Sequence, residues 1–172
     1  SIVGHPLFMP VYAMVLIFEF NPYINLQVPN SIQVIVLSIL SIFTIFLPLI
    51  SAIFLKKFGV IKSIYMKTAE ERKWPFLLSV LWYYIAFTLL TTIALPISLY
   101  LLMIGAISVI LIAHFITLRW KISIHMLGIG GVIGGMIGLS QRFQFDHFYL
   151  ILILFFVAGL IGYARLKTKS HT

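Results

Sequence analysis

The chain lacks cysteine and has few charged residues. Of its 172 residues none is Cys and only 9% are Asp, Glu, Lys or Arg, whereas 62% are hydrophobic. The absence of cysteine excludes disulfide frameworks, thiolate catalysis and Cys-based metal sites. Soluble globular proteins carry about 25% charged residues, which cover their water-facing surface. The composition therefore predicts an integral membrane protein and excludes a free soluble enzyme.

Acidic residues are especially scarce. Only 4 Asp and Glu stand against 12 Lys and Arg, which gives a net charge of +8. In a soluble protein this balance would favour a nucleic-acid partner. Here the basic residues lie in short segments between apolar runs, so the expected partners are anionic membrane lipids rather than nucleic acid. The first nine residues also lack the basic region and the cleavage site of a signal peptide, and are interpreted as the start of a trimmed chain.

Long apolar runs dominate what is present. A helix that crosses a membrane needs about 20 mostly apolar residues, and period-2 alternation typical of strands is absent. We predict one all-α polytopic transmembrane helix bundle over residues 1–172, with Pro10, Pro48 and Pro96 at kinks or helix ends. The third span is expected to start directly after Pro75. The six predicted spans are Leu7–Phe20, Ile32–Leu55, Phe76–Leu95, Ile97–Leu118, Met126–Ser140 and Phe148–Ala164.

The basic residues predict the orientation of these spans. Six spans place every Lys and Arg except Arg142 on the same side as the N-terminus. Because basic loops stay in the cytoplasm, both termini are predicted to be cytoplasmic.

The fifth span is rich in glycine. Gly130, Gly134 and Gly138 repeat at every fourth residue and leave a ridge along one face of the helix. Such ridges let helix backbones approach closely within a membrane. Tight packing inside the bundle is the favoured interpretation, and a homo-oligomer through this ridge is the alternative.

Polar residues gather at three span ends on the basic side. These segments are Lys67–Pro75, Arg119–His125 and Ala164–Thr172. Arginine and lysine hold phosphate oxygens, one imidazole can attack phosphorus, and a second imidazole can protonate the leaving oxygen. The residue types therefore indicate phosphoryl chemistry at the membrane surface.

The three segments together resemble the type 2 phosphatidic acid phosphatase superfamily, which carries Lys-x6-Arg-Pro, Pro-Ser-Gly-His and Ser-Arg-x5-His-x3-Asp motifs. Arg165 and His171 reproduce the Arg-x5-His spacing of the third motif. Ser123 and His125 keep the serine and histidine of the second motif, while Lys121-Ile122 and Ile124 replace its proline context and glycine. In the first motif Lys67 is present, but Trp74 stands at the arginine position and the nearest arginine is Arg72.

The resemblance implies a role for each matching residue. His171 would be the nucleophile that forms a phosphohistidine, and His125 would protonate the leaving group. No metal and no cofactor is implied, and the substrate would be a prenyl or glycerolipid phosphate. The family's Asp would fall three residues beyond Thr172, and its last core helix is expected to be missing from this chain. The implied phosphate-binding residues are Lys67, Arg72, Lys121, Ser123 and Arg165.

The resemblance also makes a geometric prediction. Lys67 or Arg72 should share one pocket with Ser123, His125 and Arg165, and His125 and Arg165 should lie within roughly 10 Å of each other, because several donors must reach one phosphate group. Independent lipid anchors would instead point outward to water.

Two other functions are weighed against hydrolysis. A non-catalytic protein that binds or moves anionic lipids on the same scaffold is favoured by the incomplete first two motifs. A solute transporter is disfavoured, because the spans contain almost no ionisable residue apart from His114. Many bacterial members of the superfamily also work on the periplasmic face, whereas the charge rule places these motifs in the cytoplasm.

Overall fold

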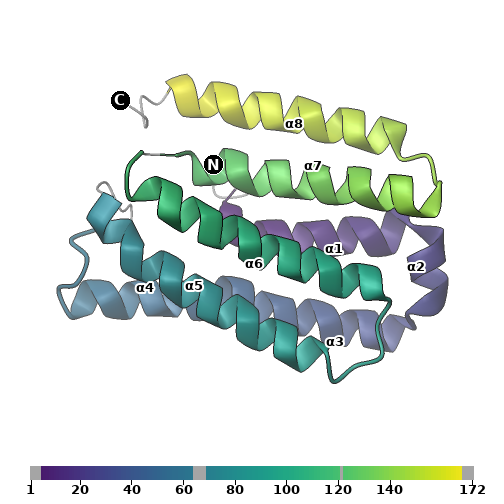
Figure 1. The fold of residues 1–172 in the computed structure, drawn as a ribbon, viewed down its shortest axis with the longest axis horizontal. Coiled ribbons are helices and arrows are strands. Elements are labelled where there is room, and N and C mark those ends of the chain that lie inside the picture. Colours follow the sequence, from purple (N-terminus) through teal and green to yellow (C-terminus); the bar gives the residue numbers. More distant parts are fainter. Residues whose placement is uncertain (1–4, 64–68, 121, 168–172) are drawn as a thin grey trace. The chain divides into compact units, whose positions relative to one another are not determined.

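The computed structural model describes residues 5–63, 69–120 and 122–167, and these residues form helices and contain no strand (Figure 1). This confirms the all-α prediction. In chain order the elements are a 3-10 helix η1 (Pro6–Phe8), α1 (Met9–Phe20), α2 (Pro22–Gln27), α3 (Asn30–Leu40), a π-helix η2 (Ser41–Phe46), α4 (Leu47–Lys57), α5 (Ala69–Leu90), α6 (Ile97–Thr117), α7 (Ile124–Phe143) and α8 (Phe148–Lys167).

Four stretches are long and apolar enough to cross a membrane. They are Asn30–Lys57, Glu71–Leu90, Ile97–Thr117 and Ile124–Phe143, and two shorter apolar helices cover Pro6–Phe20 and Phe148–Ala164. Large apolar side chains such as Phe115, Phe155 and Phe156 are exposed along these helices. Such surfaces are stable in contact with lipid and not in contact with water. The chain is therefore a membrane protein with four candidate spans, and the six predicted spans are met only in part.

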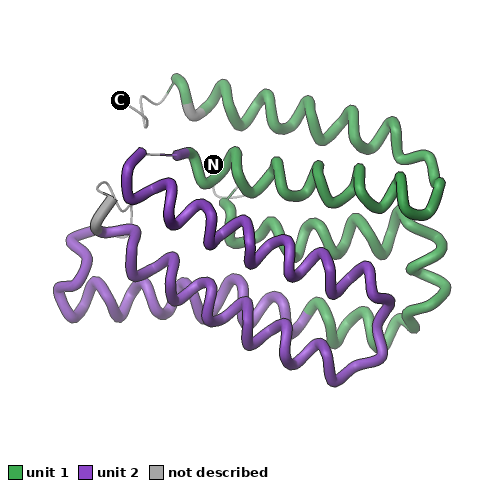
Figure 2. The backbone as a smooth tube through the Cα atoms, in the orientation of Figure 1, with its two compact units in different colours: residues 1–37, 123–172 green, residues 38–122 purple. Residues whose placement is uncertain are grey.

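The contacts divide the chain into two compact units (Figure 2). The single domain over residues 1–172 stays a prediction. Unit 1 comprises residues 1–37 and 123–172, and unit 2 comprises residues 38–122. In unit 1, α7 packs against η1, α1 and α8. Helices α7 and α8 run antiparallel, so the start of α7 lies beside the end of α8 (Figure 1). In unit 2, α5 packs against η2, α4 and α6.

The core of unit 1 follows the helical repeat of α7. Its buried residues recur every three or four positions and therefore lie on one face of the helix. They are Ile129, Val132, Ile133, Met136 and Leu139. Polar contacts fix the C-terminal end of α1. The Asn21 Oδ1 accepts a hydrogen bond from the Ile24 N–H at 3.1 Å. The His147 Nε2 lies 3.1 Å from the Phe20 carbonyl oxygen.

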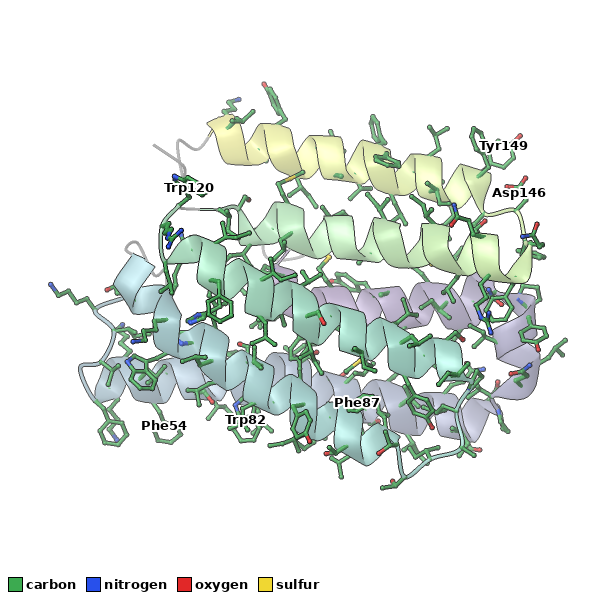
Figure 3. The ribbon with its side chains drawn as sticks, viewed as in Figure 1. Phe54, Trp82, Phe87, Trp120, Asp146 and Tyr149 are labelled. Atoms are coloured by element: carbon green, nitrogen blue, oxygen red, sulfur yellow. The ribbon has the colours of Figure 1, made fainter. Side chains whose placement is uncertain are left out.

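Two side-chain contacts align the helices of unit 2. Trp82 is carried by α5 (Figure 3), and its indole N–H donates to the Ser51 hydroxyl on α4 at 2.9 Å. The Phe87 and Tyr100 rings meet edge to face, 6.5 Å apart, between α5 and α6. An indole N–H in a membrane helix needs an internal partner, since lipid offers none. These contacts set the register of α5 between its two neighbours.

The predicted bounds of the third span are wrong at both ends. Helix α5 begins at Ala69 and contains Pro75 in its interior, and it ends at Leu90 rather than Leu95. A proline removes only one N–H donor, and other backbone bonds of a long helix tolerate that loss. At the other end, the Thr88 and Thr91 hydroxyls bond to backbone carbonyls, and such bonds compete with helix continuation.

The three prolines expected at kinks or helix ends do lie at helix starts. Pro10 stands in the first turn of α1, Pro48 in the first turn of α4 and Pro96 at the N-cap of α6. The π-helix η2 directly precedes Pro48, where the proline cannot donate to the carbonyl four residues earlier. This prediction is confirmed.

The glycine ridge of α7 does not mediate the close packing that was favoured for it. A β-carbon at Gly130, Gly134 or Gly138 would meet no described atom within 4 Å. Close packing occurs instead at Gly128, where a β-carbon would lie 2.8 Å from the Met9 Cγ. The ridge faces away from the buried side of α7, because that side is occupied by larger apolar residues. The alternative, a homo-oligomer through this ridge, stays a prediction.

Candidate functional site

Three of the seven predicted site residues have described side chains. They are Arg72 in unit 2, and Ser123 and His125 in unit 1. Arg165 lies in the last turns of α8, and its side chain is not described. Lys67, Lys121 and His171 lie outside the described residues.

Ser123 and His125 stand at the beginning of α7. Ser123 is the N-cap residue with extended backbone angles (φ −83°, ψ 105°), and its carbonyl accepts the Leu127 N–H at 3.0 Å. Its hydroxyl makes no cap hydrogen bond, and the buried Oγ has no hydrogen-bond partner within the described part of the chain. A serine at an N-cap usually bonds to a backbone N–H of the first turn. Among the described residues that hydroxyl has neither this cap bond nor another partner.

The start of α7 favours a negatively charged group. The first N–H groups of a helix point outward along its axis, and the helix dipole gives this end a partial positive charge. Phosphate and carboxylate groups bind at such ends. His125 is the second residue of this 20-residue helix and is half-buried. His125 therefore belongs to the first turn of α7, the end of the helix at which anions bind.

A second imidazole, which the sequence analysis missed, lies against His125. The ring of His5 contacts the ring of His125 edge to face, with centroids 5.7 Å apart and planes at 77°. His5 is the N-cap residue of η1, and its Nδ1 accepts a hydrogen bond from the Leu7 N–H at 3.4 Å. Partial burial lowers the pKa of His5 from the ordinary value of 6.5, so this imidazole is neutral at neutral pH.

Gly128 makes the contact between the two histidines possible. A β-carbon at Gly128 would lie 2.8 Å from the Met9 Cγ and 3.5 Å from the Pro6 Cα. The missing side chain lets η1 and the start of α1 lie directly on the first turns of α7. His5 directly precedes Pro6, so the packing of η1 on α7 brings the His5 ring into contact with His125. The His5-Pro6 pair at a helix start, on the predicted basic side, was the signal in the sequence.

The end of α8 lies beside the same turn of α7. A β-carbon at Gly162 would lie 3.6 Å from the Met126 Sδ. Arg165 follows Gly162 by three residues and therefore lies about one turn further along the same face of α8. This places the backbone of Arg165 near the start of α7. The predicted separation of the His125 and Arg165 side chains stays a prediction.

Arg72 has a structural partner in unit 2. The side chain is buried, with 7% of its surface exposed, and its Nη1 donates to the Ile122 carbonyl at 3.3 Å. Glu71 beside it accepts the Lys62 N–H at 2.9 Å. Arg72 thus holds the segment that immediately precedes Ser123. The shared pocket with Ser123, His125 and Arg165 stays a prediction, since Arg72 belongs to the other unit.

His114 is a third histidine with a different environment. It lies in the last turn of α6 and is 6% exposed. Its ring meets the Phe76 ring at 6.3 Å and the Phe115 ring at 5.6 Å, and its Nδ1 has no hydrogen-bond partner among the described residues. The Phe76 contact comes from α5, so His114 packs against that helix through its ring.

The described residues contain no cluster of three or more His, Asp or Glu side chains that could hold a metal ion. The fold and this site define an all-helical membrane protein with a polar helix start that carries two histidines and a serine. No family model, no curated protein and no solved structure matches the chain.

Proposed function

We propose that this protein is a lipid-phosphate phosphatase of a bacterial inner membrane, with six spans, both termini in the cytoplasm and the fold of the type 2 phosphatidic acid phosphatases. The observation that carries the proposal is the start of α7. There a helix N-terminus, a buried hydroxyl that no described residue hydrogen-bonds, and two imidazoles in contact lie together in unit 1. These groups suit the binding of a phosphate group and the transfer of a proton to its leaving oxygen.

The proposed reaction has two steps. The imidazole of His171 attacks the phosphorus of a prenyl or glycerolipid phosphate, a nitrogen–phosphorus bond forms, and the bond from phosphorus to the lipid oxygen breaks. His125 gives its proton to that oxygen, so the lipid leaves as an alcohol. Water then attacks the phosphohistidine and gives one proton to His125, the nitrogen–phosphorus bond breaks, and inorganic phosphate leaves, so both imidazoles return to their starting states.

The proposed binding residues stabilise the negative charge of the phosphate group. Lys67, Lys121 and Arg165 neutralise the phosphate oxygens, and the Ser123 Oγ donates a hydrogen bond to one of them. Donors that are already in position where charge develops usually supply the largest part of the rate enhancement. No metal and no cofactor takes part in this mechanism.

Binding or movement of anionic lipids without hydrolysis is the second candidate function. Arg72 favours this function over hydrolysis. Its guanidinium is buried and donates to the Ile122 carbonyl, so it has a structural role at the position where hydrolysis would need a phosphate-binding arginine. In this role the basic helix ends would hold lipid phosphates and no phosphoryl transfer would follow. A homo-oligomer through the exposed ridge of Gly130, Gly134 and Gly138 is compatible with either function.

Phosphate release by the full chain distinguishes the two functions. The purified protein in mixed micelles is supplied with phosphatidic acid, a lysophosphatidic acid and prenyl mono- and diphosphates, and inorganic phosphate is measured. We expect release from at least one substrate and its loss in His171→Ala. Binding of the same lipids without release would support the second candidate. Equal release by the wild type and His171→Ala would overturn the phosphohistidine mechanism.

A further inference from the structure

We propose that His5 and His125 form an imidazole pair that holds a single proton, in which His125 carries the proton and His5 stays neutral as its positioning residue. The inference deepens the proposed function and rests on it for its catalytic meaning. Its physical basis, the contact between the two rings, is independent of any reaction. The rings approach to 5.7 Å between centroids at 77°.

Mutual repulsion prevents both rings from being charged together. Two unit charges about 6 Å apart interact by roughly 0.7 kcal/mol in water and about 3 kcal/mol at the effective dielectric constant of a protein surface. These energies correspond to about 0.5 to 2 pH units between the first and the second protonation. The pair therefore titrates in two separated steps that belong to both residues.

Local bonding decides which ring takes the first proton. The Nδ1 of His5 accepts the Leu7 N–H at 3.4 Å, so a proton on that nitrogen would break the bond. Partial burial also lowers the pKa of His5. His125 lies in the first turn of α7, where the partial positive charge of the helix start disfavours a proton on the ring. The full negative charge of a bound phosphate exceeds that partial charge and favours the proton. With an anionic phosphate bound, the proton therefore resides on His125, where a leaving group can take it.

Three elements pack against α7 and surround this pair, namely η1, α1 and α8. His5 is the only titratable residue that η1 and its N-cap bring to His125 among the described residues, and α1 brings the apolar Met9 to this end. Helix α8 ends here with Arg165 and Lys167.

His5 acts through His125 rather than on the substrate. A neutral ring packed edge to face restricts the rotation of the neighbouring imidazole. A general acid must be oriented within hydrogen-bond reach of the leaving oxygen before it can donate. Loss of His5 should therefore lower kcat more than it raises KM.

The first test measures the pair itself. The full chain, labelled with ¹⁵N-histidine in detergent micelles, is titrated by NMR in the presence of inorganic phosphate, and the ring signals are assigned by loss in His5→Asn and in His125→Asn. We expect His125→Asn to raise the pKa of His5 by about 0.5 to 2 units, because the neighbouring charge is gone. His114→Phe serves as the matched control and should leave both signals unchanged. An unchanged His5 titration in His125→Asn would overturn the pair.

The second test measures its consequence for the reaction. Asn at position 5 keeps an acceptor for the Leu7 N–H, whereas Ala removes the acceptor and the ring together. We expect both variants to lower kcat about tenfold with little change in KM, since orientation of the acid is lost in each. Full activity in His5→Asn together with loss in His5→Ala would show a purely structural role and overturn the positioning role. If the wild type releases no phosphate but the pKa of His5 still rises in His125→Asn, the proposed function is wrong and the imidazole pair is supported.

Discussion

His125 and His114 both lie in a terminal turn of an apolar helix, but their surroundings differ. His125 lies in the first turn of α7, is half-buried, and contacts a second imidazole. Two residues before it is the Ser123 hydroxyl, which has no hydrogen-bond partner in the described part of the chain. His114 lies in the last turn of α6 and packs against the rings of Phe76 and Phe115. The same residue type thus lies at a polar helix start in unit 1 and in an apolar core in unit 2. The neighbouring side chains, and not the histidine alone, determine whether a histidine in a membrane helix can form a functional site.

The largest expected effect comes from one substitution made at both positions. His125→Phe keeps a ring but removes the proton donor, and we expect phosphate release to fall about 10²- to 10⁴-fold. His114→Phe should leave release unchanged, since its ring touches no proposed substrate group. The measurement is initial rate on the best lipid phosphate at equal folded protein. Equal losses in the two variants would abolish the distinction between site and core.

The same pair of variants also separates the two histidines by stability. The buried Nδ1 of His114 has no partner among the described residues, so its replacement by Phe should stabilise unit 2 by about 1–3 kcal/mol. His125→Phe should not stabilise unit 1, because that ring is only half-buried. Thermal unfolding in detergent, followed by circular dichroism, measures both changes. A destabilised His114→Phe would indicate an internal partner for that ring.

A glycine pair tests how His5 is held against α7. Gly128→Val would force side-chain atoms toward the Met9 Cγ and the Pro6 backbone and should cost about 1–3 kcal/mol of unfolding free energy. Gly134→Val meets no described atom within 4 Å and should leave the stability of the monomer close to wild type. The effect of each histidine on the pKa of the other, measured by NMR titration, should weaken in Gly128→Val and persist in Gly134→Val.

The oligomeric state of Gly134→Val provides a separate outcome. If the ridge joins two copies, a valine on it should lower the dimer fraction in light-scattering experiments, because the close approach of backbones is blocked. An unchanged dimer fraction, or a wild-type protein that is monomeric at all concentrations, would remove the ridge from the proposal.

Two helix starts in unit 1 provide a smaller contrast. The Asn21 side chain caps α2 through its bond to the Ile24 N–H, so Asn21→Ala should cost about 1 kcal/mol. The Ser123 hydroxyl makes no cap bond, so Ser123→Ala should change stability by less than about 0.5 kcal/mol while weakening lipid-phosphate binding. Unfolding and binding measured on both variants check the contrast. Equal destabilisation would show that Ser123 is an ordinary cap.

The smallest effect is the pH dependence of stability at His5. Partial burial lowers its pKa in the folded protein below the ordinary value of 6.5, so the unfolded chain binds more protons as the pH falls through that value. Stability is therefore fully present above about pH 6.5 and decreases below it. His5→Asn should show a shallower decrease of Tm between pH 7.5 and pH 5. An identical slope would mean that His5 does not contribute.

The sequence alone was sufficient for the class of protein and for most helices. Apolar runs longer than any strand must satisfy their backbone hydrogen bonds internally in lipid, so they form helices whatever their tertiary contacts. Pro10, Pro48 and Pro96 therefore mark helix starts as predicted. Pro75 was misjudged, because one missing donor does not end a helix that continues on both sides. The bound at Leu95 failed because threonine hydroxyls compete locally for backbone carbonyls.

Only the tertiary structure decided which residues meet. Ser123 and His125 are two positions apart and could be paired from the sequence, whereas His5 lies 120 residues from His125. That contact exists because Gly128 has no side chain and lets η1 lie on α7. The same applies to the glycine ridge, whose direction depends on which face of α7 is covered by larger apolar residues. Periodicity defines the faces of a helix, but packing against its neighbours determines which face becomes the core and which side chains share a site.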